Sequence, residues 1–484
     1  MIKYLYKWYV ALCNSPTFTT WASFLSTALY GFILLPIVST QLTIEEINVW
    51  FLLNIFVNLQ MLGDFGFGST FSRAISHAYG GANEIIIHKN VKAEDKSKSS
   101  EPNWFLIQRI FGTTSILYFL LSISLIIITG IIGYFALQIP INNLLNKNDG
   151  WISFVIILIG IFIKFNGNKY QLFLQGINKV ALLQRNRAVI TTLTVIVASI
   201  IVLQTKSLIA LILIQQIGQI ILVFRLKVLS TKYYRANIEL SDYENIFDIK
   251  LIKSIFPIAW RSWVGILMSY GLIQASGIII AQYGNPIQSS SYLFSIKIMN
   301  LIRNIANAPF YSKIPYMNQL FIRKDRESLL KLAFQRINIS LTIQTLLIGI
   351  IGVSGNYILI LIGSNVNLVD INIWTILMLS YFLERYGALH IQLLSLSNNI
   401  IWHIANSITG ILFIIFSYIL LNLVNDPILA FSVAILASTI CFYTWYSSYK
   451  SYTFYKMDFF KTEYKTTLVS VIIILFVIIF TFIK

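Results

Sequence analysis

Apolar stretches of about twenty residues recur along this chain from near its first residues to its last. A helix of that length crosses a bilayer, where only helices and closed barrels satisfy their own backbone hydrogen bonds. Hydrophobic residues make up 57% of the 484 residues, more than a water-soluble chain of this size can bury. The sequence therefore predicts an all-α, polytopic helical membrane protein. We expect about thirteen spans, at residues 17–40, 48–69, 108–137, 151–175, 184–204, 207–226, 254–281, 289–309, 337–361, 371–395, 402–424, 427–447 and 467–483.

The distribution of charge predicts how these spans are oriented. The connections expected outside the cell are short and mainly acidic, and their basic residues are Lys147 and Lys206. Basic residues gather instead in the connections expected inside, at 74–107, 227–253 and 310–336, and in the segment 450–465. By the positive-inside rule, the N-terminus lies in the cytoplasm. Membrane orientation thus accounts for the net charge of +17, and no nucleic-acid partner is expected.

Residues that catalyse reactions or hold metals are sparse and scattered. The two cysteines, Cys13 and Cys441, give no disulfide framework, and the four histidines form no ligand pair. The sequence contains no phosphate-binding loop, no zinc-binding helix motif and no nucleophile elbow. We therefore expect neither a metal nor a cofactor, and no enzyme activity.

An internal repeat emerges when the chain is aligned with itself at an offset of 221 residues. Residues 164–178 then lie over residues 385–399, so that Lys164 meets Arg385 and Gln171 meets Gln392. Both segments belong to the fourth span of a set of six, and both spans run in the same direction. We expect two six-helix lobes, residues 1–240 and 241–449, related by a parallel pseudo-two-fold axis along the membrane normal. Residues 450–484 add a basic segment and one extra span.

Polar and charged residues inside the spans indicate a functional site, because such groups usually face the interior of a helix bundle. We single out Lys164, Asn168, Gln171, Arg261, Lys297, Asn300, Arg303, Asn304, Asn307, Glu384 and Arg385. Their five cations face one mid-span carboxylate, a balance that favours an anionic and most naturally a phosphate-bearing ligand. Two alternatives stay open. The amides can join neighbouring helices, and Arg261 and Arg303 can reach the inner headgroups.

A short motif with three close glycines follows the apolar part of the second span. Asp64 stands among Gly63, Gly66 and Gly68, and the helix is expected to end at Arg73. The glycines permit either close approach of a neighbouring helix or a bend. From the residues alone, Asp64 is a helix-capping residue and Arg73 lies at the membrane interface.

Residues 32–73, FILLPIVSTQLTIEEINVWFLLNIFVNLQMLGDFGFGSTFSR, carry a resemblance to a known family. The segment resembles the polysaccharide flippases of the multidrug/oligosaccharidyl-lipid/polysaccharide exporter superfamily, especially the O-antigen translocases. The shared pattern is a span, a short acidic turn, and a span leading into Gly-Asp-x-Gly and an arginine. The resemblance implies that a lipid-linked oligosaccharide, usually on undecaprenyl diphosphate, is flipped to the outer leaflet of the bacterial cytoplasmic membrane. It also implies two lobes around a cavity that opens alternately to each side.

For individual residues, the resemblance implies that spans one, two, seven and eight line the cavity. Arg261, Lys297 and Arg303 would then face its interior. A coupling or gating role is expected of Asp64, Arg73 and Glu384. The coupling ion is either H+ or Na+, and a polysaccharide polymerase or other assembly proteins are expected partners. The chain departs from the family pattern in its insert at 74–107 and in its thirteenth span.

Two other functions are compatible with a polytopic chain. Glu45 and Glu46 in the first outer turn resemble the acidic pair of a membrane glycosyltransferase, polysaccharide polymerase or ligase. Such enzymes usually need a large outer loop, whereas the longest outer connection here is about residues 138–150. A multidrug exporter of the same fold would need buried carboxylates for cationic drugs, and the expected interior has the opposite charge.

Overall fold

The structure, a computed structural model, describes residues 14–81, 101–236, 247–268, 272–282, 285–311, 325–397 and 401–483, with a few positions between 313 and 321. Most of the insert predicted at 74–107 therefore lies outside the described residues, as do the side chains of Arg73 and Arg261. The described residues form helices joined by turns, with no strand among them. The predicted all-α class is confirmed.

The helices belong to two compact units, which are described separately here. The first comprises Met1–Leu42 and Leu52–Trp263, and the second comprises Thr43–Phe51 and Val264–Lys484. The chain passes between the units in the turn after Leu42, again within α4 (Ile44–Gly63), and a third time within α10 (Ile249–Ile266).

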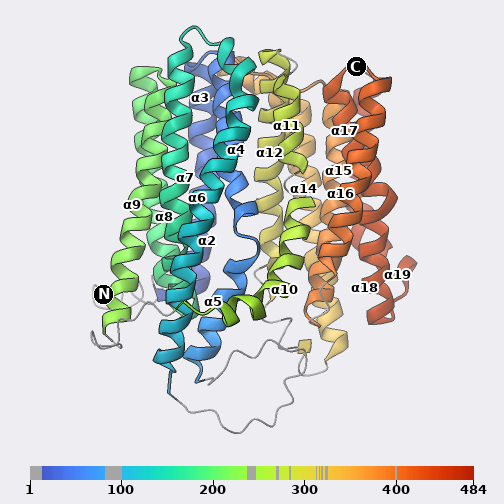
Figure 1. Cartoon of the computed structure of the whole chain (residues 1–484). Helices are drawn as coiled ribbons and strands as arrows, with labels where there is room; N and C mark the ends of the chain where they lie inside the picture. The colour runs from blue at the N-terminus through green and yellow to red at the C-terminus, as the bar shows by residue number, and fades with distance from the viewer. Residues whose placement is uncertain are drawn as a thin grey trace, which may run out of the picture. The chain divides into compact units, whose positions relative to one another are not determined.

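The first unit contains α2 (Pro16–Leu29), the π-helix η1 (Tyr30–Leu34), α3 (Leu35–Gln41), α5 (Phe67–Tyr79), α6 (Trp104–Asn142), α7 (Lys147–Gly176), α8 (Val180–Thr205) and α9 (Leu208–Arg235). Helix α7 packs against α5, α6 and α9, and α2 packs against α8. Figure 1 shows α6 to α9 as long, nearly parallel rods. The fourth membrane helix is therefore the centre of this unit.

The second unit contains α11 (Leu272–Gln282), α12 (Pro286–Tyr311), α14 (Arg326–Leu361), α15 (Ile371–Ser395), α16 (Trp402–Leu423), α17 (Pro427–Ser438), the π-helix η4 (Thr439–Tyr443), α18 (Thr444–Tyr455) and α19 (Phe459–Ile483). Helix α15 packs against α12, α14, α17 and α18, and α16 packs against α17. The fourth helix of this set is again central. As in the first unit, the fourth helix packs against the third and the sixth.

Side chains at the helix starts explain where many of these helices begin. At the start of six helices, the side chain of the residue before the first turn accepts a hydrogen bond from a backbone N–H of that turn. These capping residues are Ser15 for α2, Asn103 for α6, Ser207 for α9, Asp325 for α14, Asp370 for α15 and Asp426 for α17. Such caps satisfy donors that no helix can satisfy internally. The short polar turns of the sequence thus set the helix boundaries.

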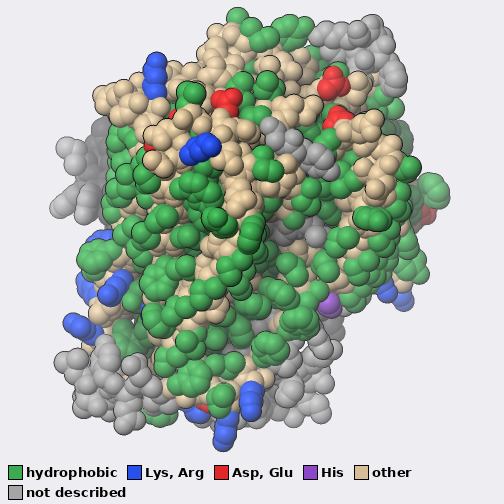
Figure 2. Space-filling view, turned by 45° about the horizontal axis from the view of Figure 1, so that its top comes forward, with side chains coloured by type: hydrophobic (Ala, Val, Ile, Leu, Met, Phe, Trp, Pro, Cys, Tyr) green, Lys and Arg blue, Asp and Glu red, His purple; other side chains and the backbone are tan. Residues whose placement is uncertain are grey.

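Among the residues that the structure describes, eight helical segments are long and apolar enough to cross a membrane: Phe18–Gln41, Trp104–Asn142, Lys147–Gly176, Val180–Thr205, Leu208–Arg235, Arg326–Leu361, Trp402–Leu423 and Pro427–Tyr455. The remaining predicted spans are also largely helical where described, but they are interrupted or carry more polar residues. Figure 2 shows hydrophobic side chains over most of the visible surface, with charged side chains mainly toward its upper and lower parts. The chain is a multi-pass membrane protein.

Candidate functional site

The glycine motif forms a break between two helices. Helix α4 ends at Gly63 and α5 begins at Phe67, because Phe65 and Gly66 adopt left-handed conformations with φ of 48° and 73°. Glycine adopts that conformation readily, whereas phenylalanine is strained there. Both readings of the glycines apply: Gly66 forms the bend, and a Cβ at Gly63 would lie only 3.0 Å from the Leu125 side chain of α6, so Gly63 permits that helix to approach closely. The expectation that the helix ends at Arg73 is wrong, because α5 restarts after the break and continues to Tyr79.

Hydrogen bonds hold this break in place. The Asp64 carboxylate accepts a bond from the backbone N–H of Gly68 at 2.9 Å and another from the Tyr118 hydroxyl of α6. The indole N–H of Trp263 donates to the Leu62 carbonyl at 2.7 Å. Asp64 thus caps the start of α5, as its residue type predicts. A gating role for Asp64 and Arg73 stays a prediction.

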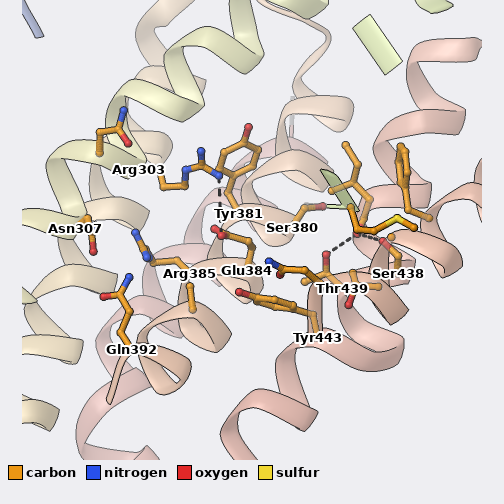
Figure 3. A pocket seen from close by; sticks show the side chains of 18 residues that line it. Arg303, Asn307, Ser380, Tyr381, Glu384, Arg385, Gln392, Ser438, Thr439 and Tyr443 are labelled. Atoms are coloured by element: carbon orange, nitrogen blue, oxygen red, sulfur yellow. Dashed lines mark hydrogen bonds and ion pairs between the residues drawn. The ribbon is translucent and has the colours of Figure 1, made fainter. Parts of the chain in front are cut away.

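The second unit encloses a cavity of about 370 Å³ among α12, α15, α16, α17 and η4 (Figure 3). Positions 381, 384, 385, 388 and 392 of α15 line it, and their spacing places them on one helix face. From α12 the cavity receives Arg303, Asn304 and Asn307. The remaining lining residues are Met268, Ser380, Asn406, Thr409, Gly410, Phe413, Ile435, Ser438, Thr439 and Tyr443.

Two arginines and one glutamate give the cavity its charge. Nη1 of Arg303 lies 4.0 Å from Oε1 of Glu384, a loose ion pair. The Arg303 guanidinium also lies 5.8 Å from the ring centre of Tyr381, whose hydroxyl donates to Asn300 Oδ1 at 3.3 Å. Arg385 is 5% exposed, and Figure 3 shows it between Asn307 and Glu384. The three formal charges sum to one positive charge.

Several buried polar atoms on the cavity wall have no hydrogen-bond partner within the described part of the chain. They are Asn307 Oδ1, Glu384 Oε2, Arg385 Nε, Gln392 Oε1 and Thr409 Oγ1. A buried polar atom without a partner costs about 1–3 kcal/mol. Five such atoms around one space indicate that the cavity is built to receive a polar molecule.

The structure brings together part of the predicted site. Arg303, Asn304, Asn307, Glu384 and Arg385 meet in the cavity. Asn300 lies one helical turn before Asn304 and accepts a hydrogen bond from the Tyr381 hydroxyl. Lys297 is half-buried on α12 and is not among the residues that line the cavity. The side chain of Arg261 lies outside the described residues.

The predicted polar stripe of α7 lies in the first unit. There Gln171 accepts a hydrogen bond of 2.6 Å from Nη2 of Arg187 on α8, and Lys164 lies within the electrostatic reach of the same arginine. Nε of Arg225 on α9 donates to Asn186 Oδ1 of α8 at 3.2 Å. Amides of this unit therefore join neighbouring helices, as the alternative interpretation expected. Asn168 lies half-buried on the same helix.

Sequence reasoning missed the uncharged part of the cavity wall. Tyr381, Asn406, Thr409 and Tyr443 are single polar groups in apolar spans, a pattern that resembles ordinary helix packing. Asn406 and Thr409, three residues apart, form one weak signal. A second is the sequence Ser-Thr at the π-helix η4, because such irregular turns are frequent at functional sites.

The opposite face of α15 holds a second polar cluster. His390 is fully buried, and its Nε2 lies 3.7 Å from Oε1 of Glu463 on α19. The same carboxylate oxygen accepts hydrogen bonds from the hydroxyls of Tyr386, at 2.6 Å, and Tyr452. Thr466 donates to the other oxygen at 3.2 Å. This cluster attaches the extra C-terminal helix to α15.

Comparison with solved structures finds the same arrangement of helices in known transporters. An inward-facing multidrug resistance MATE family transporter of the MOP superfamily aligns with a TM-score of 0.60 and 12% identity, over 92% of this chain and 96% of that one. The lipid II flippase MurJ, in an inward closed conformation, aligns with a TM-score of 0.55 and 13% identity, over 95% and 96%. This chain shares the fold of these two proteins. Comparison with protein-family models and with curated proteins finds no match.

Another structure with the MOP fold adds a contrast. A transporter from Pyrococcus furiosus aligns with a TM-score of 0.57 and 11% identity, over 93% of this chain and 99% of that one. It is described as having a binding pocket of reversed polarity that suggests a different function. At these identities the likeness establishes the fold. The function has to be argued from the side chains of this chain.

Proposed function

We propose that this protein is a flippase for a lipid-linked oligosaccharide. Its substrate is carried on undecaprenyl diphosphate and moves from the inner to the outer leaflet of the bacterial cytoplasmic membrane, in surface polysaccharide or O-antigen biosynthesis. The observation that carries the proposal is the excess of positive charge on the membrane helices. In the described cavity, Arg303 and Arg385 face the single carboxylate of Glu384.

The physical problem in such a reaction is the diphosphate. Unpaired charge in hydrocarbon costs tens of kcal/mol by Born estimates, so a headgroup of this kind cannot cross a bare bilayer. Fixed cations offset that cost, and we assign this role to Lys164, Arg261, Lys297, Arg303 and Arg385. An inside-negative potential drives an anion outward with about 2.3 kcal/mol per charge per 100 mV. Transport therefore needs no ATP.

The proposed mechanism is alternating access between two lobes, residues 1–240 and 241–449. The coupling ion is H+ or Na+, and coupling or gating falls to Asp64, Arg73 and Glu384. The amides of Asn168, Gln171, Asn300, Asn304 and Asn307 line the path. The MurJ neighbour, described as a lipid II flippase, supports a substrate in which a glycan is joined to a lipid. Assembly proteins such as a polysaccharide polymerase would receive the product.

The main competing function is export of cationic drugs, since several structural neighbours are multidrug transporters. A cationic drug requires a free carboxylate in its binding site. Here the carboxylate of the cavity has Arg303 at 4.0 Å and Arg385 beside it in the sequence. Like-charge repulsion would weaken binding of a cation in this site.

The proposal can be tested by transport in vesicles of phosphatidylethanolamine and phosphatidylglycerol. These would contain purified protein and the lipid-linked glycan extracted from the cells that make it. The glycan carries a fluorophore, and a quencher that cannot cross the membrane reports how much of it lies in the exposed leaflet. We expect Lys297→Ala to abolish transport and Lys297→Arg to retain part of it, because the charge is kept while the geometry changes. Lys297→Glu should be worst, because it repels the diphosphate.

A matched control is Lys147→Glu, which makes the same charge change at an exposed residue in the first turn of α7. Its transport should equal that of the unmodified protein. A packing role for Lys297 predicts a different order, in which alanine is tolerated or lowers the amount of protein. Full transport by well-expressed Lys297→Glu protein would exclude Lys297 from the mechanism. Failure of the unmodified protein to move the lipid-linked glycan would refute the proposed function.

A further inference from the structure

We infer that the cavity of the second unit is a carbohydrate subsite, which binds one end of the glycan while the diphosphate lies outside it. The inference rests on the proposed function and refines it: Arg303 and Arg385, which line the cavity, act on the glycan, and the diphosphate falls to Lys164, Arg261 and Lys297. Its basis is the chemistry of the polar atoms that the cavity leaves without partners.

Those atoms include both donors and acceptors of hydrogen bonds. Asn307 Oδ1, Gln392 Oε1 and Glu384 Oε2 can only accept a bond, and Arg385 Nε can only donate one. The hydroxyl of Thr409 can do either. A ligand that fits this wall must therefore donate several bonds and accept others within a small space.

A phosphate group does not meet this requirement. Its oxygens would accept bonds from Arg385 and Thr409, but they would also face the Glu384 carboxylate and the unpartnered amide oxygens of Asn307 and Gln392. Two hydrogen-bond acceptors repel each other, so the oxygens of Glu384, Asn307 and Gln392 would still have no donor. A hydroxyl group donates and accepts at once, so a sugar ring with several hydroxyls can satisfy all five atoms.

The apolar part of the wall supports the same class of ligand. The rings of Tyr381, Tyr443 and Phe413 line the cavity beside the polar atoms. An aromatic face packs well against the C–H face of a sugar ring, while the hydroxyls at the ring edge reach the polar groups. Figure 3 shows Tyr381 and Tyr443 around Glu384, with Gln392 and Asn307 further along the wall.

The size and position of the cavity fit one end of a longer substrate. A volume of about 370 Å³ is at the small end of the range for ligand sites and has room for roughly one or two sugar rings. Lys297 lies on α12 six residues before Arg303, which is about 9 Å along the helix axis. That separation suits a diphosphate near Lys297 joined to a sugar in the cavity.

Binding to the purified full-length protein, measured by calorimetry, tests the inference with two probes. One is the free oligosaccharide that mild acid releases from the extracted lipid-linked glycan, and the other is undecaprenyl diphosphate without sugar. We expect Gln392→Leu and Asn307→Leu each to weaken oligosaccharide binding at least tenfold and to leave undecaprenyl diphosphate binding within twofold. Thr409→Val, which removes one hydroxyl at constant shape, should weaken oligosaccharide binding about threefold. Because this change is small, it keeps the test valid if either leucine variant misfolds.

The control is Asn372→Leu, the same substitution at an exposed position of α15 outside the cavity. It should bind both probes as the unmodified protein does. The inference is overturned if the unmodified protein fails to bind the oligosaccharide up to about 10 mM, or if all three cavity variants bind it normally. Competition by inorganic pyrophosphate that the cavity variants abolish would show instead that the cavity holds the diphosphate. In these cases the proposed function stands as long as the lipid-linked glycan is still transported, so the two failures are distinguishable.

Discussion

Helices α7 and α15 are each the central helix of their unit, yet their polar residues have different roles. In α7, Gln171 binds Arg187 of the next helix at 2.6 Å, which fixes one helix against another. In α15, Arg385 and Gln392 face a cavity, and each has a polar atom without a hydrogen-bond partner among the described residues. These polar residues therefore join helices in the first unit and line a cavity in the second.

The two helices also differ on the face turned away from these residues. In the offset repeat, Lys169 of α7 corresponds to His390 of α15. The nitrogen of Lys169 lies 5.4 Å from the ring centre of its neighbour Tyr170, whereas His390 is buried against Glu463 of α19. Helix α19 comes after both sets of six. The second unit has thus gained a helix, and the central helix of that unit carries the residues that hold it.

The largest effect should come from neutralising one arginine in each unit, Arg385 at the cavity and Arg187 at the contact between α7 and α8. Arg385→Gln removes a buried donor of the cavity and leaves Glu384 with Arg303 as its nearest cation, so we expect transport to fall by about thirtyfold or more. Arg187→Gln keeps a hydrogen-bonding side chain opposite Gln171, so we expect a loss of about twofold. Vesicle transport at equal protein amounts measures both. Equal losses would show that the two units are used alike.

A smaller effect should follow from adding one methyl group to each central helix. A Cβ at Gly387 would lie 2.8 Å from the Tyr443 ring, and one at Gly167 would lie 2.5 Å from Val223. Both Gly→Ala changes overpack a helix contact and should lower stability by about 1–3 kcal/mol. Because Tyr443 lines the cavity, Gly387→Ala should also reduce transport by roughly tenfold.

Thermal unfolding in detergent and vesicle transport separate these two contributions. Gly167→Ala should lower the midpoint of unfolding while the folded protein transports normally. If Gly167→Ala also lost transport in proportion to its stability, the position of Tyr443 would not be the cause of the effect at Gly387.

The sequence predicts the fold class because the bilayer makes the pattern of apolar runs decisive. The sequence also locates the charged half of the cavity, because charges such as Arg303, Glu384 and Arg385 are costly within a membrane helix and therefore mark functional positions. The uncharged half could not be predicted. Thr409 and Ser438 are common on helices that pack together, and only the three-dimensional arrangement turns them toward one space.

Two other features needed the structure for different reasons. The break after Gly63 depends on the left-handed conformation of Phe65, a residue that gives no signal of a turn. Glu463 lies in a basic tail segment, where a carboxylate looks like ordinary surface charge. Its role becomes visible once the chain folds back and places it beside His390, more than seventy residues away in the sequence.

The smallest effect concerns the helix that distinguishes the second unit. Glu463 lies in the first turns of α19, before the apolar segment Thr466–Ile479. Burial opposes its ionisation, but the neighbouring His390 imidazole and the hydroxyls of Tyr386 and Tyr452 outweigh burial and hold the pKa of Glu463 below its ordinary value. A carboxyl with a lowered pKa stabilises the folded state above its ordinary pKa of about 4.3, and this stabilisation is lost as pH falls through the lower folded value.

Glu463→Gln should therefore lower the midpoint of thermal unfolding at pH 7 and differ less from the unmodified protein as the pH falls below about 4. Asp458→Asn, at an exposed residue just before α19, is the matched control and should not show this convergence. A difference between Glu463→Gln and the unmodified protein that stayed constant across the pH range would mean that the side chain acts by shape, and that no charge holds α19 to α15.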